Sequence, residues 1–89
     1  MKKIKLFILR NCPFCLQALD WQSKILAENP AFREIPIEII DESEQPEVAY
    51  SYGYYYVPSY YVDEKKVHEG VATREKIENV FIMALENDE

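Results

Sequence analysis

The sequence has few cysteine and histidine residues, which are the usual zinc ligands, and comparatively few basic residues. Its 89 residues include two cysteines and one histidine, His68. Tetrahedral zinc sites need four ligands, which cysteine and histidine usually supply, so one chain cannot complete a Cys/His zinc site and we expect no bound metal. Ten Lys and Arg stand against 16 Asp and Glu, giving a formal net charge of −6. This charge argues against a nucleic acid or an anionic membrane as a partner.

Long hydrophobic runs are also missing. The apolar stretch after Lys5 covers only residues 6–9, which is shorter than the hydrophobic region of a signal peptide and far shorter than a membrane span. The sequence contains no internal repeat, linker or low-complexity segment. We therefore expect a single domain over residues 1–89 in a cytoplasmic protein. In that compartment paired cysteines are more often catalytic than structural.

Both cysteines belong to the motif Cys12-Pro13-Phe14-Cys15, which follows a short apolar run and opens a stretch with helical periodicity. Pro13 suits the first position of a helix, which makes Cys12 the N-cap and places Cys15 one turn further on the same side. Unpaired backbone N–H groups and the helix dipole favour a thiolate at Cys12, and a second thiol nearby can resolve a mixed disulfide. The motif therefore predicts a dithiol–disulfide active site. Half of a metal site and a structural disulfide are the alternatives.

Hydrophobic periodicity predicts the element order β-α-β-α-β-β-α. Strands are expected at 4–9, 35–40, 59–62 and 67–69, and helices at 13–28, 44–52 and from Thr73, the expected N-cap, to 85. Each of the first two helices would supply a crossover between parallel strands, and the polar residues 63–66 would form a hairpin turn. We expect an α/β fold with a four-stranded mixed sheet flanked by three helices.

All seven tyrosines lie between Tyr50 and Tyr61. Such a cluster can form a recognition surface, because each ring offers area and each hydroxyl offers hydrogen bonding. Alternate members can also simply fill the sheet and cover its edge. Tyr55 and Tyr56, next to Val57-Pro58, are the two that we expect to contact a ligand.

With this element order, the Cys-Pro-Phe-Cys motif and Val57-Pro58, the chain resembles the thioredoxin superfamily and, by size and motif, the glutaredoxins. The resemblance covers nearly the whole chain and implies a thioredoxin-like, glutaredoxin-type fold. Glutaredoxins typically carry Cys-Pro-Tyr-Cys, so Phe14 lacks one hydroxyl. The resemblance implies a cis bond at Val57-Pro58, although an arbitrary X–Pro bond is usually trans. It also implies that the Val57 backbone pairs with glutathione or a peptide like an added strand.

The chain departs from the glutaredoxin pattern after its last strand. Glutaredoxins usually have a Gly-Gly pair there, followed by a polar residue and an Asp that hold the γ-glutamyl end of glutathione. Here the stretch 69–74 keeps one glycine, lacks that carboxylate and adds the negative charge of Glu69. Backbone N–H groups at Ala72 and Thr73 could still bind a carboxylate, with Arg10 and Arg74 supplying positive charge.

These observations predict a small thiol–disulfide oxidoreductase that is monomeric and holds no bound cofactor. Cys12 would attack the disulfide of a protein or of glutathione, the possible co-substrate, and Cys15 would resolve the mixed disulfide. Pro13 and Phe14 would shape the active-site turn, and Tyr56, Val57 and Pro58 would bind substrate. The electrons would come from a reductase. The alternatives are a glutaredoxin-like protein served by thioredoxin reductase, a thioredoxin-fold adaptor that binds through its tyrosines, and [2Fe–2S] binding, which proline after the first cysteine disfavours in the family.

Overall fold

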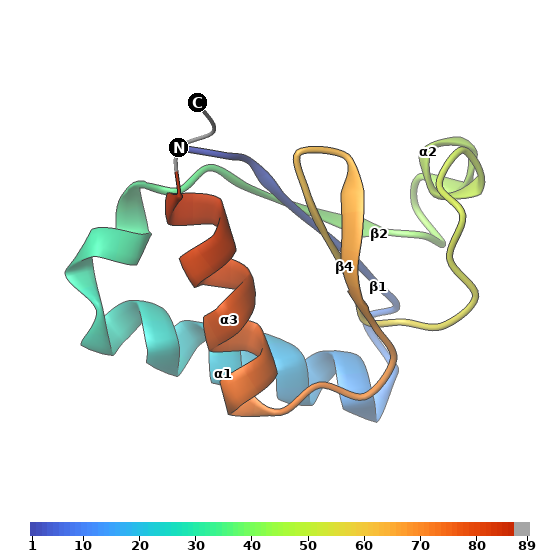
Figure 1. Ribbon diagram of the computed structural model, residues 1–89. Helices are drawn as coiled ribbons and strands as arrows, with labels where there is room; N and C mark the ends of the chain where they lie inside the picture. The colour runs from blue at the N-terminus through green and yellow to red at the C-terminus, as the bar shows by residue number, and fades with distance from the viewer. Residues whose placement is uncertain (87–89) are drawn as a thin grey trace.

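The computed structural model describes residues 1–86 and shows a four-stranded mixed sheet with helices on both faces (Figure 1). The elements are β1 (Ile4–Ile8), α1 (Pro13–Glu28), the 3₁₀ helix η1 (Pro30–Glu34), β2 (Ile37–Asp41), α2 (Pro46–Tyr50), β3 (Ser59–Val62), β4 (Lys65–Glu69) and α3 (Arg74–Leu85). The strand order is β2-β1-β3-β4, with β1 parallel to β2 and β3 antiparallel to both β1 and β4. The predicted fold class is confirmed. The predicted single domain over 1–89 extends beyond the described residues and stays a prediction.

Helix α1 begins and ends where the sequence predicts, for local reasons. Pro13 occupies its first turn after the extended N-cap Cys12. At the other end the backbone N–H of Asn29 donates to the Ile25 carbonyl at 3.0 Å, and the Asn29 side chain donates to the same oxygen at 2.8 Å. Pro30 then prevents the helix from continuing. These contacts fix the length of the helix that carries the two cysteines.

Several details of the secondary structure differ from the prediction. η1 was not predicted, and it buries Phe32 against Phe81 with ring centroids 5.5 Å apart. Ile35 is buried but lies before β2, which begins only after Pro36. The last hairpin has a two-residue turn, because Asp63 and Glu64 both take positive φ (48° and 72°), the backbone that tight hairpin turns need. β4 therefore starts two residues earlier than predicted.

The second crossover was predicted wrongly. Helix α2 is shorter than expected, and it does not connect parallel strands. β3 instead runs antiparallel to β1, with Phe7 paired to Ser59 and Ile4 paired to Val62. This reversal matters for function, because it brings the start of β3 to the same edge of the sheet as the end of β1.

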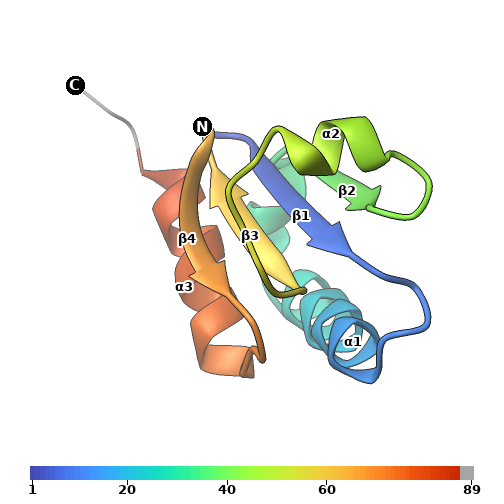
Figure 2. The same cartoon turned by 90° about the vertical axis from the view of Figure 1, so that its right-hand side faces the viewer.

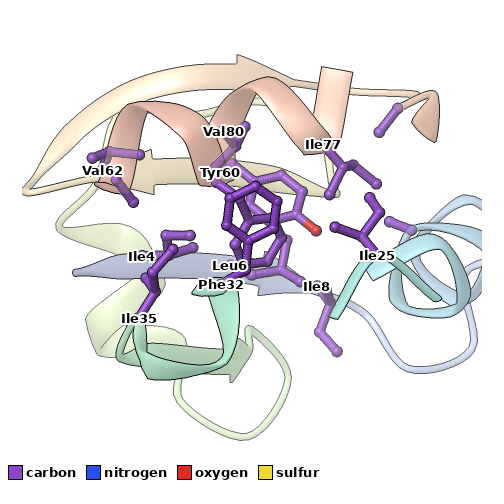
Figure 3. Close-up of a cluster of buried hydrophobic side chains, with 14 of the residues drawn as sticks. Ile4, Leu6, Ile8, Ile25, Phe32, Ile35, Tyr60, Val62, Ile77 and Val80 are labelled. Carbon is purple, nitrogen blue, oxygen red and sulfur yellow. The ribbon is translucent and has the colours of Figure 1, made fainter. Parts of the chain in front are cut away.

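Two hydrophobic clusters hold the layers together. α1 and α3 cover one face of the sheet over the larger cluster, in which Tyr60 has a central place (Figure 3). α2 and the loop after it lie over the opposite face (Figure 2), where Phe7, Ile40 and Tyr61 form the smaller cluster with Tyr52 and Tyr54 packed against it. Four of the seven tyrosines therefore serve packing, which is the alternative interpretation given above for the tyrosine-rich segment: Tyr52, Tyr54, Tyr60 and Tyr61. No helix within residues 1–86 is both long and apolar enough to cross a bilayer.

Candidate active site

The predicted site residues gather at one edge of the sheet because of strand direction. Parallel strands β1 and β2 end side by side, with Ile8 paired to Asp41. Antiparallel β3 begins beside them, with Ser59 paired to Phe7. The loop into α1, the loop after β2 and the residues just before β3 therefore meet at this edge. The edge holds the Cys12–Cys15 motif together with Val57 and Pro58.

Cys12 sits at the N-terminus of α1 in a setting that favours its thiolate. Its own N–H donates to the Leu9 carbonyl at 3.0 Å, which fixes the turn ahead of the helix. The pKa of Cys12 is lowered chiefly by a hydrogen bond from the Cys15 backbone N–H, helped by the Cys15 thiol and the Phe14 N–H, against an opposing effect of burial. These donors belong to the first turn of α1, where the Cys15 N–H also donates to the Cys12 carbonyl at 3.0 Å and the helix dipole favours a negative sulfur.

Cys15 has the opposite environment. Its side chain is fully buried, and its Sγ accepts a hydrogen bond from the Leu9 N–H at 3.4 Å. The pKa of Cys15 is raised to about 11, chiefly by burial, because a thiolate there loses contact with water; the Leu9 N–H opposes this rise and the neighbouring Cys12 adds to it. Both cysteines are free thiols, Cys12 half-buried and Cys15 buried. The two sulfurs are therefore unequal, with Cys12 the more readily ionised and the more accessible.

Val57 and Pro58 lie at the same edge of the sheet as the motif, joined by a cis peptide bond as the resemblance implies. Pro58 is buried and its carbonyl accepts the Gly70 N–H at 2.9 Å. Val57 packs against both hydrophobic clusters, and Cys12 packs against the larger one. Within residues 1–86, neither the N–H nor the carbonyl of Val57 has a hydrogen-bond partner. Both groups are free to pair with an extended segment of another molecule.

The loop ahead of Val57 is held by Glu69, a role that the sequence did not reveal. Its carboxylate accepts the backbone N–H groups of Tyr55 and Tyr56, the latter at 2.9 Å, and pairs with Lys66 at 2.7 Å. The pKa of Glu69 is lowered to about 2, first by Lys66 and then by the Tyr55 N–H. The negative charge of Glu69, which departs from the glutaredoxin pattern, thus fixes the backbone that leads into Val57.

The predicted anion-binding residues are engaged within the protein. Arg10 faces two carboxylates, with its Nε 3.6 Å from Asp41 and 3.9 Å from Glu44. Arg74 pairs with Glu28 and lies 3.6 Å from Glu78.

The remaining predicted residues are placed as follows. Thr73 caps α3 by accepting the Lys76 N–H at 3.2 Å, and Ala72 is buried in the larger cluster. Tyr56 and Phe14 are exposed beside the site, at 70% and 50%. Exposure of Phe14 leaves an apolar ring facing solvent within the motif.

Glu42 and Tyr54 are a second feature that the sequence did not reveal. The Glu42 N–H donates to the Ile8 carbonyl at 3.0 Å, and its carboxylate accepts the Tyr54 hydroxyl at 2.8 Å. Burial and this carboxylate both raise the pKa of Tyr54, and Glu42 also raises the pKa of Cys15. Asp41-Glu42-Ser43 is an ordinary strand end in the sequence, and only the fold brings it beside the thiols.

In the described part of the chain, no three His, Cys, Asp or Glu side chains are grouped to hold a metal ion.

Comparison with known families gives one match. The family model described as "Thioredoxin domain" matches residues 2–82, which include every element from β1 to most of α3. No curated protein sequence matches the chain.

Proposed function

Since the chain belongs to the thioredoxin-domain family and has the thioredoxin-like α/β fold, we propose that it is a thiol–disulfide oxidoreductase acting on protein disulfides through Cys12 and Cys15. The observation that carries this proposal is the placement of two free thiols at one helix N-terminus, Cys12 half-buried at the N-cap and Cys15 fully buried, which displaces their pKa values in opposite directions. A nucleophile must be ionised near neutral pH, whereas a resolving thiol can stay protonated until it is needed. A pair of structural cysteines has no need of this asymmetry.

The reaction follows from the two environments. The Cys12 thiolate attacks one sulfur of the substrate disulfide, forming a mixed disulfide and releasing the other substrate sulfur as a thiolate that takes up a proton. Cys15 then loses its proton and attacks Cys12 Sγ, which releases the second substrate thiol. The substrate gains two electrons and two protons, and the protein is left with a Cys12–Cys15 disulfide. A reductase must return the two electrons for another turnover.

Val57 is the proposed substrate-binding residue next to Cys12. Its free N–H and carbonyl would bind the extended backbone of the substrate beside the scissile disulfide, as an added strand. The Glu69 bonds to Tyr55 and Tyr56 keep this backbone in place before the substrate arrives. Preorganisation of this kind lowers the entropy cost of binding.

The subtype and the electron source are also part of the proposal. The Cys-Pro-Phe-Cys motif supports a glutaredoxin-like subtype. The pairing of Arg10 and Arg74 with carboxylates supports protein disulfides over glutathione, because both cations already face carboxylates of this chain with which the two carboxylates of that tripeptide would compete. We infer that a thioredoxin-reductase-type enzyme is the electron donor.

The test is NADPH-coupled turnover of two substrates with two electron donors. Insulin is the protein disulfide and a cysteine–glutathione mixed disulfide is the small one, each assayed with thioredoxin reductase and, separately, with glutathione plus its reductase. We expect insulin reduction with thioredoxin reductase and little turnover through glutathione. Cys12→Ser should abolish turnover, and Cys15→Ser should accumulate a covalent mixed disulfide visible by mass spectrometry. Undiminished turnover by Cys12→Ser, or turnover only with glutathione, would overturn the corresponding part of the proposal.

A further inference from the structure

A hollow of about 440 Å³ opens on the α2 side of the molecule, next to the edge that holds the cysteines. Its size falls within the ordinary range of pockets that take small ligands or single side chains. Its walls come from α2, from the loop after it and from the end of β2. They include Tyr50, Tyr52, Tyr54 and Tyr55 together with Glu42 and Gly53. The mechanism proposed above gives this hollow no role.

The wall of the hollow contains a carboxylate, and the two lysines that contact wall residues, Lys5 at Tyr52 and Lys66 at Gly53, are paired with other carboxylates. Glu42 is the charged residue in its wall, and no lysine or arginine lines it. One Glu42 oxygen accepts the Tyr54 hydroxyl, while the other has no partner among the described residues.

The basic side chains around the hollow are already paired with carboxylates. Lys66 pairs with Glu69 at 2.7 Å, Lys5 with Glu64 at 2.8 Å, and Arg10 faces Asp41. A cation entering the hollow would therefore meet an unmatched carboxylate oxygen. It would also approach a chain whose net charge is −6.

The tyrosines suit the same kind of ligand. The face of an aromatic ring attracts a cation placed within about 6 Å of its centre. One ring of this wall already does so, since the Lys5 ammonium lies 4.9 Å from the centroid of Tyr52. Tyr50 and Tyr55 are 91% and 88% exposed and so are free to close over an incoming group.

The hollow is within reach of a substrate held at the active site. Tyr55 precedes Val57 by two residues, and the backbone N–H of Glu42 donates a hydrogen bond to the Ile8 carbonyl at the end of β1. Two residues of chain span at most about 7 Å, so a substrate side chain a few positions from the substrate cysteine can lie alongside Tyr55 when the substrate backbone pairs with Val57. Resting on the function proposed above, we propose that the hollow binds the cationic side chain of an arginine or lysine in the substrate protein.

Binding can be tested without any redox step. The full-length ¹⁵N-labelled protein is titrated with N-acetyl-arginine amide and, separately, with its uncharged citrulline analogue. We expect the arginine compound alone to shift the amide resonances of residues 50–55 saturably at millimolar concentration. Glu42→Gln and Tyr50→Ala should each weaken this binding by about three- to fivefold. Ile82→Ala, an exposed position on α3 outside the hollow, is the control and should bind like the parent protein. Equal shifts with both compounds, or none with either, would refute the inference.

A kinetic arm tests whether the cation belongs to the substrate. Two disulfide peptides that differ only in arginine or citrulline three residues from the cysteine are compared by kcat/KM. We expect a preference of about tenfold for arginine, reduced to about twofold by Glu42→Gln or by 0.5 M NaCl. Reduction of both peptides at equal rates would refute the inference while leaving the oxidoreductase proposal intact. Arginine binding without reduction of either peptide would uphold the hollow as a cation site and refute the oxidoreductase proposal.

Discussion

Iodoacetamide should modify Cys12 well before Cys15 in the reduced, folded protein. The pKa of Cys12 is lowered from an ordinary value of 9.0, whereas that of Cys15 is raised to about 11. A difference of at least two pKa units makes the thiolate fraction of Cys12 at least about 100 times that of Cys15 at neutral pH. A more acidic thiolate is also less nucleophilic, which offsets roughly tenfold of this advantage. At least about a tenfold difference in rate remains, and the burial of Cys15 widens it.

The assay quenches the alkylation at timed intervals between pH 6 and pH 10 and locates the label by fragment-ion mass spectrometry. The rate at Cys12 should rise with a midpoint below pH 9.0, while Cys15 should stay nearly unlabelled over most of the range. The control is the same protein in 8 M urea. There the helix N-terminus and the burial are both lost, so the two thiols should react at similar rates.

Comparable labelling of the two cysteines in the folded protein would refute the reasoning. It would mean that the N–H groups at the start of α1 do not stabilise the Cys12 thiolate, and that the nucleophile cannot be assigned from position in the helix. Faster labelling of Cys15 would reverse the assigned roles.

Three further predictions concern the elements that hold the site. Tyr60→Phe should lower the free energy of unfolding, measured in urea, by about 1–3 kcal/mol, because the buried Gln22 oxygen, which lies 2.8 Å from the hydroxyl, loses its donor. If this is the cause, Tyr60→Phe should cost less when Gln22 is already replaced in Gln22→Leu. Costs of the two substitutions that simply add would contradict it. Thr73→Ala should lower stability by about 1 kcal/mol through loss of the α3 cap, and an unchanged melting temperature would show that the cap contributes nothing. Glu69→Gln should reduce insulin turnover and should weaken the loss of stability that occurs at acid pH. The pKa of Glu69 is depressed to about 2 in the folded state, so the stability that this carboxylate contributes is present above about pH 4.5 and is lost as the pH falls toward 2. Unchanged turnover and an unchanged acid limb would refute the role given to that carboxylate.

Local signals account for the parts of the fold that the sequence predicts. Pro13 and Asn29-Pro30 mark the limits of α1 because proline restricts its own backbone and that of its predecessor. The direction of β3 could not be predicted in this way. A helix between two strands permits a parallel crossover but does not require one, and the outcome depends on which strand edge is free when the layers pack.

The candidate site likewise has residues that the sequence predicts and residues that only the structure reveals. Cys12 and Cys15 are recognisable because four consecutive residues contain the chemistry and its helix N-terminus. Glu69 and Glu42 are not recognisable, because each acts on residues at least 12 positions away, Tyr55 and Tyr56 for the first and Tyr54 for the second. Carboxylates at strand ends are common in sequences, and only the pairing of strands reveals which ones face a functional loop.

Charge pairing at this edge is also the reason why we propose a protein substrate for the site in place of glutathione. A glutathione carboxylate at Arg10 would share the guanidinium with Asp41, whose side chain is 3% exposed and also accepts hydrogen bonds from the Ser43 N–H and hydroxyl at 2.8 and 2.6 Å. These bonds, those from Ser43 first, lower the pKa of Asp41, so it stays charged and competes with any incoming carboxylate for the same guanidinium. A cationic segment meets no such competition, because Glu42 keeps one oxygen unmatched. We therefore expect the same arrangement of carboxylates to disfavour the acidic tripeptide and to favour a basic stretch of a protein chain.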